Sequence, residues 1–155
     1  MTREEFIEVL DKKGYSYEIE GDKIVVTHYA DIYLNSLKTL SLSVEFKNDG
    51  DVCLNSLKTL LPGVEFKNEG YVGLNSLKTL SPGVEFKNDG DVWLVGLKTL
   101  PPGVEFKNGE DVCLKSWIGR EGWNNNGWFD DWEGNIKGID SKRLLNLMIS
   151  KGMFI

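Results

Sequence analysis

The chain has 155 residues, of which 41% are hydrophobic and 27% are charged, and its formal net charge is −6. This length suits a single domain, residues 1–155, that can bury a substantial core. The basic residues form no cluster of the kind that phosphate contacts require, so we expect no direct binding of nucleic acid. No apolar run approaches the ~18 residues of a membrane span. The charged start "MTREEFIEVL" also lacks the apolar stretch of a signal peptide, so we expect a cytoplasmic protein without a membrane partner.

Residues 1–30 are predicted to form an N-terminal α-β-β cap. Thr2 and Glu5 have the spacing of a capping box at the start of a helix, and Gly14 is suited to end that helix. The stretch "YSYEIEGDKIVVT" then predicts two strands that turn at Gly21-Asp22. Such a cap would cover an otherwise exposed strand edge, which invites aggregation.

A 20-residue repeat fills residues 31–116. The stretch "DIYLNSLKTL" at position 31 recurs as "DVCLNSLKTL" at 51, "YVGLNSLKTL" at 71 and "DVWLVGLKTL" at 91. Each unit holds two short runs, such as "GVEFKN" and "DVCL", that alternate with the period of a half-buried strand. For "LNSLKTLLPG" between them we expect a tight coil that ends in a Pro-Gly corner. A fixed period of this length is typical of a solenoid, in which like residues stack on like.

Stacking at this period predicts columns of identical side chains. Val, Leu and Phe columns form the core, and Asn columns form amide ladders at the corners. Glu65, Glu85 and Glu105 lie in one column, where diagonal contacts with a neighbouring Lys column offset their repulsion. Cys53 and Cys113 lie three rungs apart, about 14 Å at the usual strand spacing. This separation is too large for a disulfide, so both thiols are expected to be free.

One column varies where the others repeat, and alternation predicts that all of its members point outward. Its members are Tyr33, Cys53, Gly73, Trp93 and Cys113. Either exposed positions vary without constraint, or a constant scaffold presents a varied face to a partner. Exposed aromatic residues are typical interface anchors, and Val95-Gly96 replaces Asn-Ser beside Trp93. Our hypothesis is a partner-binding face that includes Tyr33 and the glutamate column and is centred near Trp93.

Residues 117–155 are predicted to form a C-terminal cap. The stretch "SWIGREGWNNNGWFDDWEGNIKGI" breaks the period and holds four of the five tryptophans. A final helix is expected from about Ser141 to Lys151, capped by Asp140 or Ser141 and stopped by Gly152. Its predicted apolar side comprises Leu144, Leu145, Leu147, Met148 and Ile149. The tryptophans either close the last rung or bind a sugar, peptide or protein, with Trp123 and Trp128 as candidate binding residues.

The sequence carries no defensible enzyme signature. His28 is the single histidine and has no second histidine or paired cysteine nearby, which gives little support for zinc binding or catalysis. Asp130, Asp131 and Glu133 could in principle hydrolyse a glycoside, although acidic residues on a polar loop are usually only solvated. Motifs of nucleotide-binding proteins, metalloproteases and serine hydrolases are missing. We therefore expect a protein that is not an enzyme and uses no cofactor or metal.

The stretch "LVGLKTLPPGVEFKN", residues 94–108, resembles short leucine-rich-like repeats of bacterial and phage proteins, and the resemblance covers about residues 24–117. It implies a solenoid rather than an activity. "VCLNSLKTLLP" is also similar to the leucine-rich signature, which leaves a leucine-rich-repeat horseshoe as an alternative fold. However, Leu57 stands where that signature has its ladder asparagine, which favours a compact β-solenoid. In architecture the chain looks like the small acidic pentapeptide-repeat proteins, some of which inhibit enzymes by imitating DNA, although it lacks their five-residue motif.

Together these patterns predict a mainly β protein, a right-handed parallel β-solenoid of 20-residue rungs with a cap at each end. The expected function is binding of a protein partner, as a phage or mobile-element inhibitor of a bacterial nuclease or other nucleic-acid-processing or defence enzyme. Such an inhibitor would be anti-CRISPR-like or a DNA mimic. The alternative is a carbohydrate-binding protein that uses the Trp-rich segment. Association of two copies into a homodimer is also open.

Overall fold

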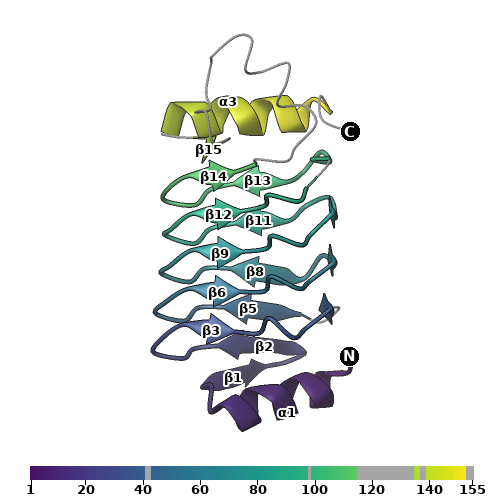
Figure 1. Ribbon diagram of the computed structural model, residues 1–155, viewed down its shortest axis with the longest axis vertical. Coiled ribbons are helices and arrows are strands. Elements are labelled where there is room, and N and C mark those ends of the chain that lie inside the picture. The colour runs from purple at the N-terminus through teal and green to yellow at the C-terminus, as the bar shows by residue number, and fades with distance from the viewer. Residues whose placement is uncertain (41–42, 98, 115–134, 137–138, 153–155) are drawn as a thin grey trace.

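The structure is a computed structural model that describes residues 1–40, 43–97, 99–114, 135–136 and 139–152. Short parallel strands stack into a column with a helix at each end (Figure 1). Paired residues lie 20 positions apart, as in Ile32 with Val52 and Val44 with Val64. The predicted β-solenoid with 20-residue rungs is therefore confirmed.

Each rung contributes strands to as many as three sheets. The first sheet, in spatial order, comprises β1 (Tyr17–Glu20), β2 (Lys23–Val26), β5 (Val44–Phe46), β8 (Val64–Phe66), β11 (Glu85–Phe86) and β13 (Glu105–Phe106). The second comprises β15 (Asn135–Ile136), β14 (Val112–Cys113), β12 (Val92–Trp93), β9 (Val72–Gly73), β6 (Val52–Cys53) and β3 (Ile32–Tyr33). The third comprises β10 (Thr79–Leu80), β7 (Thr59–Leu60) and β4 (Thr39–Leu40).

The third sheet lies in the segment that was expected to be coil only. A tight turn is present there, because the Leu57 amide donates to the Leu54 carbonyl at 3.1 Å. After the turn, Thr59 is exposed and Leu60 is buried, and both pair with the same residues of the neighbouring rungs. In-register stacking lets even this two-residue stretch share its backbone hydrogen bonds with its copies. A strand this short has no periodicity that a sequence could reveal.

The core consists of columns of identical buried side chains. The phenylalanine column comprises Phe46, Phe66, Phe86 and Phe106. Adjacent rings in it have centroid distances of 5.5, 5.5 and 5.3 Å and are nearly parallel. Each ring therefore packs on its own copy in the next rung, within the distance range of offset-stacked aromatic pairs.

A column of buried asparagines fixes the turn between the first and second sheets. Its members are Asn48, Asn68, Asn88 and Asn108. The Asn68 side-chain amide donates to the Gly50 carbonyl of the preceding rung at 3.0 Å and to the Tyr71 carbonyl of its own turn at 3.1 Å. His28 takes this place in the first rung, where its backbone carbonyl accepts from the Asp49 amide at 3.0 Å. The predicted amide ladder thus joins consecutive rungs.

The N-terminal cap follows the prediction. Helix α1 (Arg3–Lys13) begins with a capping box, since the Glu5 amide donates to Thr2 Oγ1 and the Thr2 amide donates to Glu5 Oε2. It ends at Gly14, whose φ of 70° is in the left-handed region that glycine tolerates best. Phe6 and Leu10 of α1 are buried in the core, and β1 pairs antiparallel with β2.

The C-terminal cap differs from the prediction in three details. Helix α3 (Ile139–Ser150) begins earlier than expected, so Asp140 and Ser141 lie inside its first turn and do not precede it. Leu147 is 53% exposed, whereas Leu145 and Ile149 are buried, because only a narrow stripe of the helix meets the last rung. Strand β15, which the sequence did not suggest, pairs antiparallel with β14.

One side chain of α3 closes the first sheet. The Phe106 amide donates to Asn146 Oδ1 at 2.8 Å, and Asn146 Nδ2 donates to the Phe106 carbonyl at 2.9 Å. The Asn146 side chain therefore satisfies the free backbone groups of Phe106 in β13, which the backbone of a further rung would otherwise pair. Lys142 also donates to the Asn108 carbonyl, at the end of the asparagine column. These contacts satisfy backbone groups that would otherwise offer an open edge.

Replacing Asn146 by Asp is expected to loosen this cap. A carboxylate still accepts from the Phe106 amide but cannot donate to the Phe106 carbonyl, so the two oxygens repel each other. We expect a loss of about 1–3 kcal/mol in unfolding free energy in urea, and faster hydrogen exchange of the Phe106 amide.

The matched control is Asn35→Asp. Asn35 is exposed, and its Oδ1 accepts from the Asn55 amide at 2.9 Å, which a carboxylate can also do. The control should therefore leave stability nearly unchanged. Equal stability and equal exchange in both variants would contradict the capping role of Asn146.

Candidate functional site

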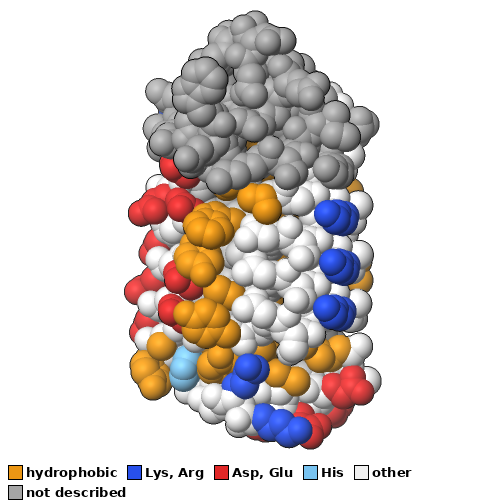
Figure 2. Space-filling model, viewed as in Figure 1, with side chains coloured by type: hydrophobic (Ala, Val, Ile, Leu, Met, Phe, Trp, Pro, Cys, Tyr) orange, Lys and Arg blue, Asp and Glu red, His pale blue; other side chains and the backbone are white. Residues whose placement is uncertain are grey.

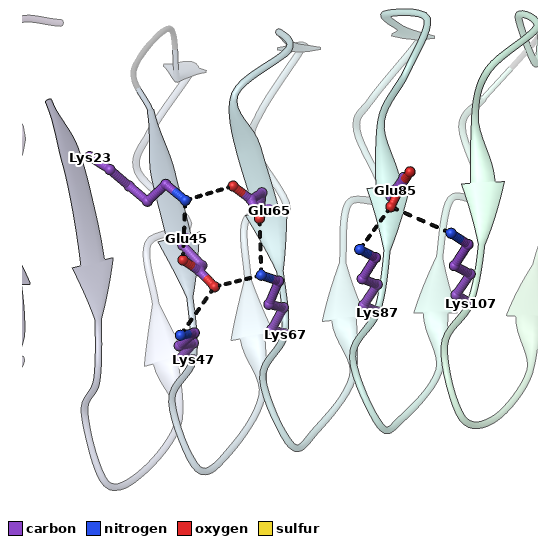
Figure 3. Close-up of polar contacts among 8 residues, drawn as sticks. All are labelled: Lys23, Glu45, Lys47, Glu65, Lys67, Glu85, Lys87 and Lys107. Atoms are coloured by element: carbon purple, nitrogen blue, oxygen red, sulfur yellow. Dashed lines mark hydrogen bonds and ion pairs between the residues drawn. The ribbon is translucent and has the colours of Figure 1, made fainter. Parts of the chain in front are cut away.

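The outward face of the first sheet is a ladder of alternating charges (Figure 3). Lys67 Nζ lies 2.9 Å from Glu45 Oε1 and 3.2 Å from Glu65 Oε2, and Lys23 Nζ lies 2.9 Å from Glu65 Oε1. A second group continues the pattern, with Lys107 Nζ 3.1 Å from Glu105 and 3.7 Å from Glu85.

The sequence suggested three glutamates for partner binding: Glu65, Glu85 and Glu105. Each of them already forms ion pairs with lysines along the first sheet. The diagonal contacts that were expected to offset the stacking of like charges are present. This face is close to neutral and offers little charge to a partner.

Glu45 is the most deeply placed carboxylate of the ladder, and its side chain is 3% exposed. Burial opposes its ionisation, but the hydrogen bonds from Lys67 and Lys23 and the charges of Lys67 and Lys47 outweigh burial and lower its pKa. A depressed pKa in the folded state adds stability above the ordinary value of 4.5, and this stability disappears as the pH falls through the folded-state pKa.

Replacing Glu45 by Gln should therefore change how stability depends on pH. The variant loses about 1–3 kcal/mol at pH 7, because three lysines lose a buried counter-charge. Below the folded-state pKa the wild type has lost the same contribution, so the two proteins should converge. Urea unfolding at a series of pH values measures the difference, and a constant difference across the acid range would contradict the assignment. Glu18→Gln, on exposed β1, is the control.

The varied column behaves differently from the prediction that all five members are exposed. Tyr33 and Trp93 are 48% and 40% exposed, but Cys53, Gly73 and Cys113 are buried. Both cysteines are free, as expected. Cys113 belongs to β14 and pairs with Asn135 of the added strand β15.

Cys53 is covered by Tyr71, a residue that sequence reasoning missed. The Tyr71 hydroxyl lies 3.1 Å from Cys53 Sγ, and the Tyr71 ring stacks on the Trp93 ring at a centroid distance of 5.1 Å. At Gly73, beside the Tyr71 ring, a Cβ would approach Asn55 Oδ1 to 3.0 Å, which is tighter than usual, and would touch the ring at 3.4 Å. The signal was present in the sequence, since Tyr71 interrupts a column that is otherwise aspartate.

This contact also affects two titrations. The hydrogen bond with Cys53, together with burial, raises the pKa of Tyr71 above its ordinary value. Burial raises the pKa of the Cys53 thiol. Cys53 is therefore expected to be an unreactive thiol.

We expect Tyr71→Ala to expose Cys53. In a Cys113→Ser background, the reaction of Cys53 with a disulfide reagent should become at least about tenfold faster, because access and not intrinsic chemistry limits it. Tyr71→Phe keeps the covering ring and should react almost as slowly as the parent protein. Equal rates in the alanine and phenylalanine variants would contradict the covering role of the ring.

The exposed aromatics lie on a surface with charged borders. We call it the front face; it comprises Tyr33, Tyr71, Trp93 and the Asn-Ser pairs at 35–36, 55–56 and 75–76. Figure 2 shows acidic side chains along one border, hydrophobic side chains beside them and basic side chains along the opposite border. The acidic margin is formed by the exposed residues Asp49, Glu69, Asp89 and Glu110, and the lysine margin by the exposed residues Lys38, Lys58 and Lys78.

Neither margin is neutralised in the way that the first sheet is. Within the described ranges, no residue of either margin forms an ion pair. A second row of aspartates beside the acidic margin is structural. Asp31 Oδ1 accepts from the Asp51 amide at 2.8 Å, and Asp51 Oδ1 accepts from the Tyr71 amide at 2.9 Å.

Among the residues that the structure describes, the remaining candidates form no second site. Trp123 and Trp128, like Asp130, Asp131 and Glu133, lie outside the described residues. His28 is buried, and its Nδ1 accepts from the Ser16 amide at 3.3 Å. In the part of the chain that the structure describes, no group of three or more histidine, cysteine or acidic residues could hold a metal ion. Neither of the two described helices has the length and hydrophobicity of a membrane-spanning segment.

No protein-family model, curated protein or solved structure matches this chain significantly. The resemblance to leucine-rich-like repeats of bacteria and phages therefore stays a prediction. The surface itself is the basis on which a function is inferred.

Proposed function

We propose that this protein is a binding solenoid whose front face docks on a protein with a basic surface. The observation that carries the proposal is the exposed aromatic strip, with Tyr33 and Trp93, beside an acidic margin of four carboxylates on successive turns. The partner we propose is a bacterial nuclease or another nucleic-acid-processing or defence enzyme. The protein would then act as an inhibitor carried by a phage or mobile element.

The two parts of the face suit different aspects of such binding. Aromatic side chains are frequent anchors of protein interfaces, and the stack on Tyr71 holds the Trp93 ring in place. Carboxylates that repeat at about the 4.8 Å strand spacing form a linear array of negative charge. Enzymes that bind nucleic acid use clusters of arginine and lysine for phosphate contacts, and such clusters would be attracted to this array.

The scaffold keeps this face rigid, which lowers the entropic cost of binding. The aspartates behind the acidic margin hold the backbone of the next rung, and the buried asparagines hold the turns. A partner therefore meets a preformed surface. Blocking of a partner's basic site also needs no catalytic group in this chain.

The test is capture from a bacterial lysate with immobilised protein, followed by a nuclease assay of the captured partner. Trp93→Ala and the triple variant Asp49→Asn, Glu69→Gln, Asp89→Asn should each reduce recovery at least about tenfold, a typical loss for interface anchors. Recovery should also fall in about 1 M salt, where the Debye length is about 3 Å. The purified partner should lose activity on DNA when titrated with the wild type.

The matched control neutralises three exposed acidic residues of the N-terminal cap: Glu18→Gln, Glu20→Gln and Asp22→Asn. It should recover as much partner as the wild type. Equal recovery by all variants would contradict the proposed face. Glycan-array binding that is lost in Trp123→Ala and Trp128→Ala would instead support the carbohydrate-binding alternative.

A further inference from the structure

The front face carries both signs of charge in a regular arrangement. The acidic margin follows one border of the stack and the lysine margin follows the other, each with one residue per rung (Figure 2). Along a rung, the chain crosses the face from Asp51 through Cys53 and Ser56 to Lys58. Asp49, Glu69 and Asp89 are 20 residues apart, and so are Lys38, Lys58 and Lys78, so both margins advance along the stack by the same step per rung.

We infer that the front face also docks on the front face of a second copy of the chain, with the two solenoids parallel and related by a two-fold axis along their length. The inference rests on the proposed function only in that both use the front face for protein docking. A two-fold axis of this direction exchanges left and right but not height. It therefore places the acidic margin of each copy over the lysine margin of the other.

Other arrangements do not match the charges. A two-fold axis across the rungs would place acidic residues over acidic residues and lysines over lysines. The face of the first sheet has no such complementarity to offer, because its glutamates and lysines already pair with one another. Only the front face leaves opposite charges of one period without partners among the described residues, and an isologous dimer pairs them twice.

A second copy also matches the spacing of the charges. Both solenoids rise by one strand spacing per rung, so the charge pairs stay in register from one end of the face to the other. A partner of another fold would lose this match after one or two rungs.

Trp93 adds a contact that the charged margins alone do not supply. Its ring is 40% exposed on the front face, and aromatic side chains are frequent anchors of protein interfaces, so docking of a second copy buries it.

The test measures self-association by sedimentation equilibrium over a range of protein concentrations. One variant has a reversed acidic margin, Asp49→Lys, Glu69→Lys and Asp89→Lys, and the other a reversed lysine margin, Lys38→Glu, Lys58→Glu and Lys78→Glu. Each variant alone should associate at least about tenfold more weakly than the wild type, since like charges then face each other. An equimolar mixture of the two variants should restore the dimer, because one copy is basic on both margins and the other is acidic on both. Trp93→Ala, which leaves every charge in place, should weaken the dimer as well.

The control reverses three charges away from the face: Glu18→Lys, Glu20→Lys and Asp22→Lys on the N-terminal cap. It should dimerise like the wild type, and circular dichroism checks that every variant keeps its β structure. A wild type that stays monomeric, or a mixture that fails to restore association, overturns the inference. Capture of a foreign partner separates the two proposals. The variant with the reversed acidic margin should fail to capture a basic partner, and the variant with the reversed lysine margin should still capture it. Each of the two variants alone should fail to dimerise.

Discussion

In-register parallel pairing between residues 20 positions apart is the constraint on which the rest of the structure depends. The Leu34 amide donates to the Cys53 carbonyl, and the Leu54 amide to the Gly73 carbonyl, both at 2.9 Å. Because every rung repeats this register, each side chain meets its own copy above and below. A slip of one residue would turn the buried columns to solvent, so the register and the core stabilise each other.

Stacking of like on like needs a different solution for each kind of side chain. Apolar columns only need to pack, and the phenylalanines do so as nearly parallel rings. Buried asparagines give their amide hydrogens to carbonyls of two rungs, and aspartates such as Asp31 accept the amide of the next rung. Glutamates and lysines of the first sheet neutralise one another along the diagonal. The charges on the two margins of the front face form no ion pairs within the described chain. A partner of opposite charge would therefore gain the most electrostatic binding energy there.

Tyr71 shows how one departure from the repeat affects several rungs. Its hydroxyl contacts Cys53 in the rung below, and its ring stacks on Trp93 in the rung above. Part of the variation in this column is therefore explained by packing, since Cys53 is buried beneath Tyr71. Of the five members of this column, only Tyr33 and Trp93 are exposed aromatic residues.

The period of 20 residues and the alternation within each unit were enough to predict the solenoid, its core columns, the capping box at Thr2 and Glu5, and two free cysteines. These features depend on spacing along the chain, which a sequence records directly. The strand at Thr59–Leu60, the antiparallel strand opposite Cys113, the exposure of Leu147 and the position of Tyr71 over Cys53 were decided by the tertiary structure alone. Each of them depends on contacts between segments that stacking brings together. Alternation along one strand does not encode what a neighbouring rung places over it.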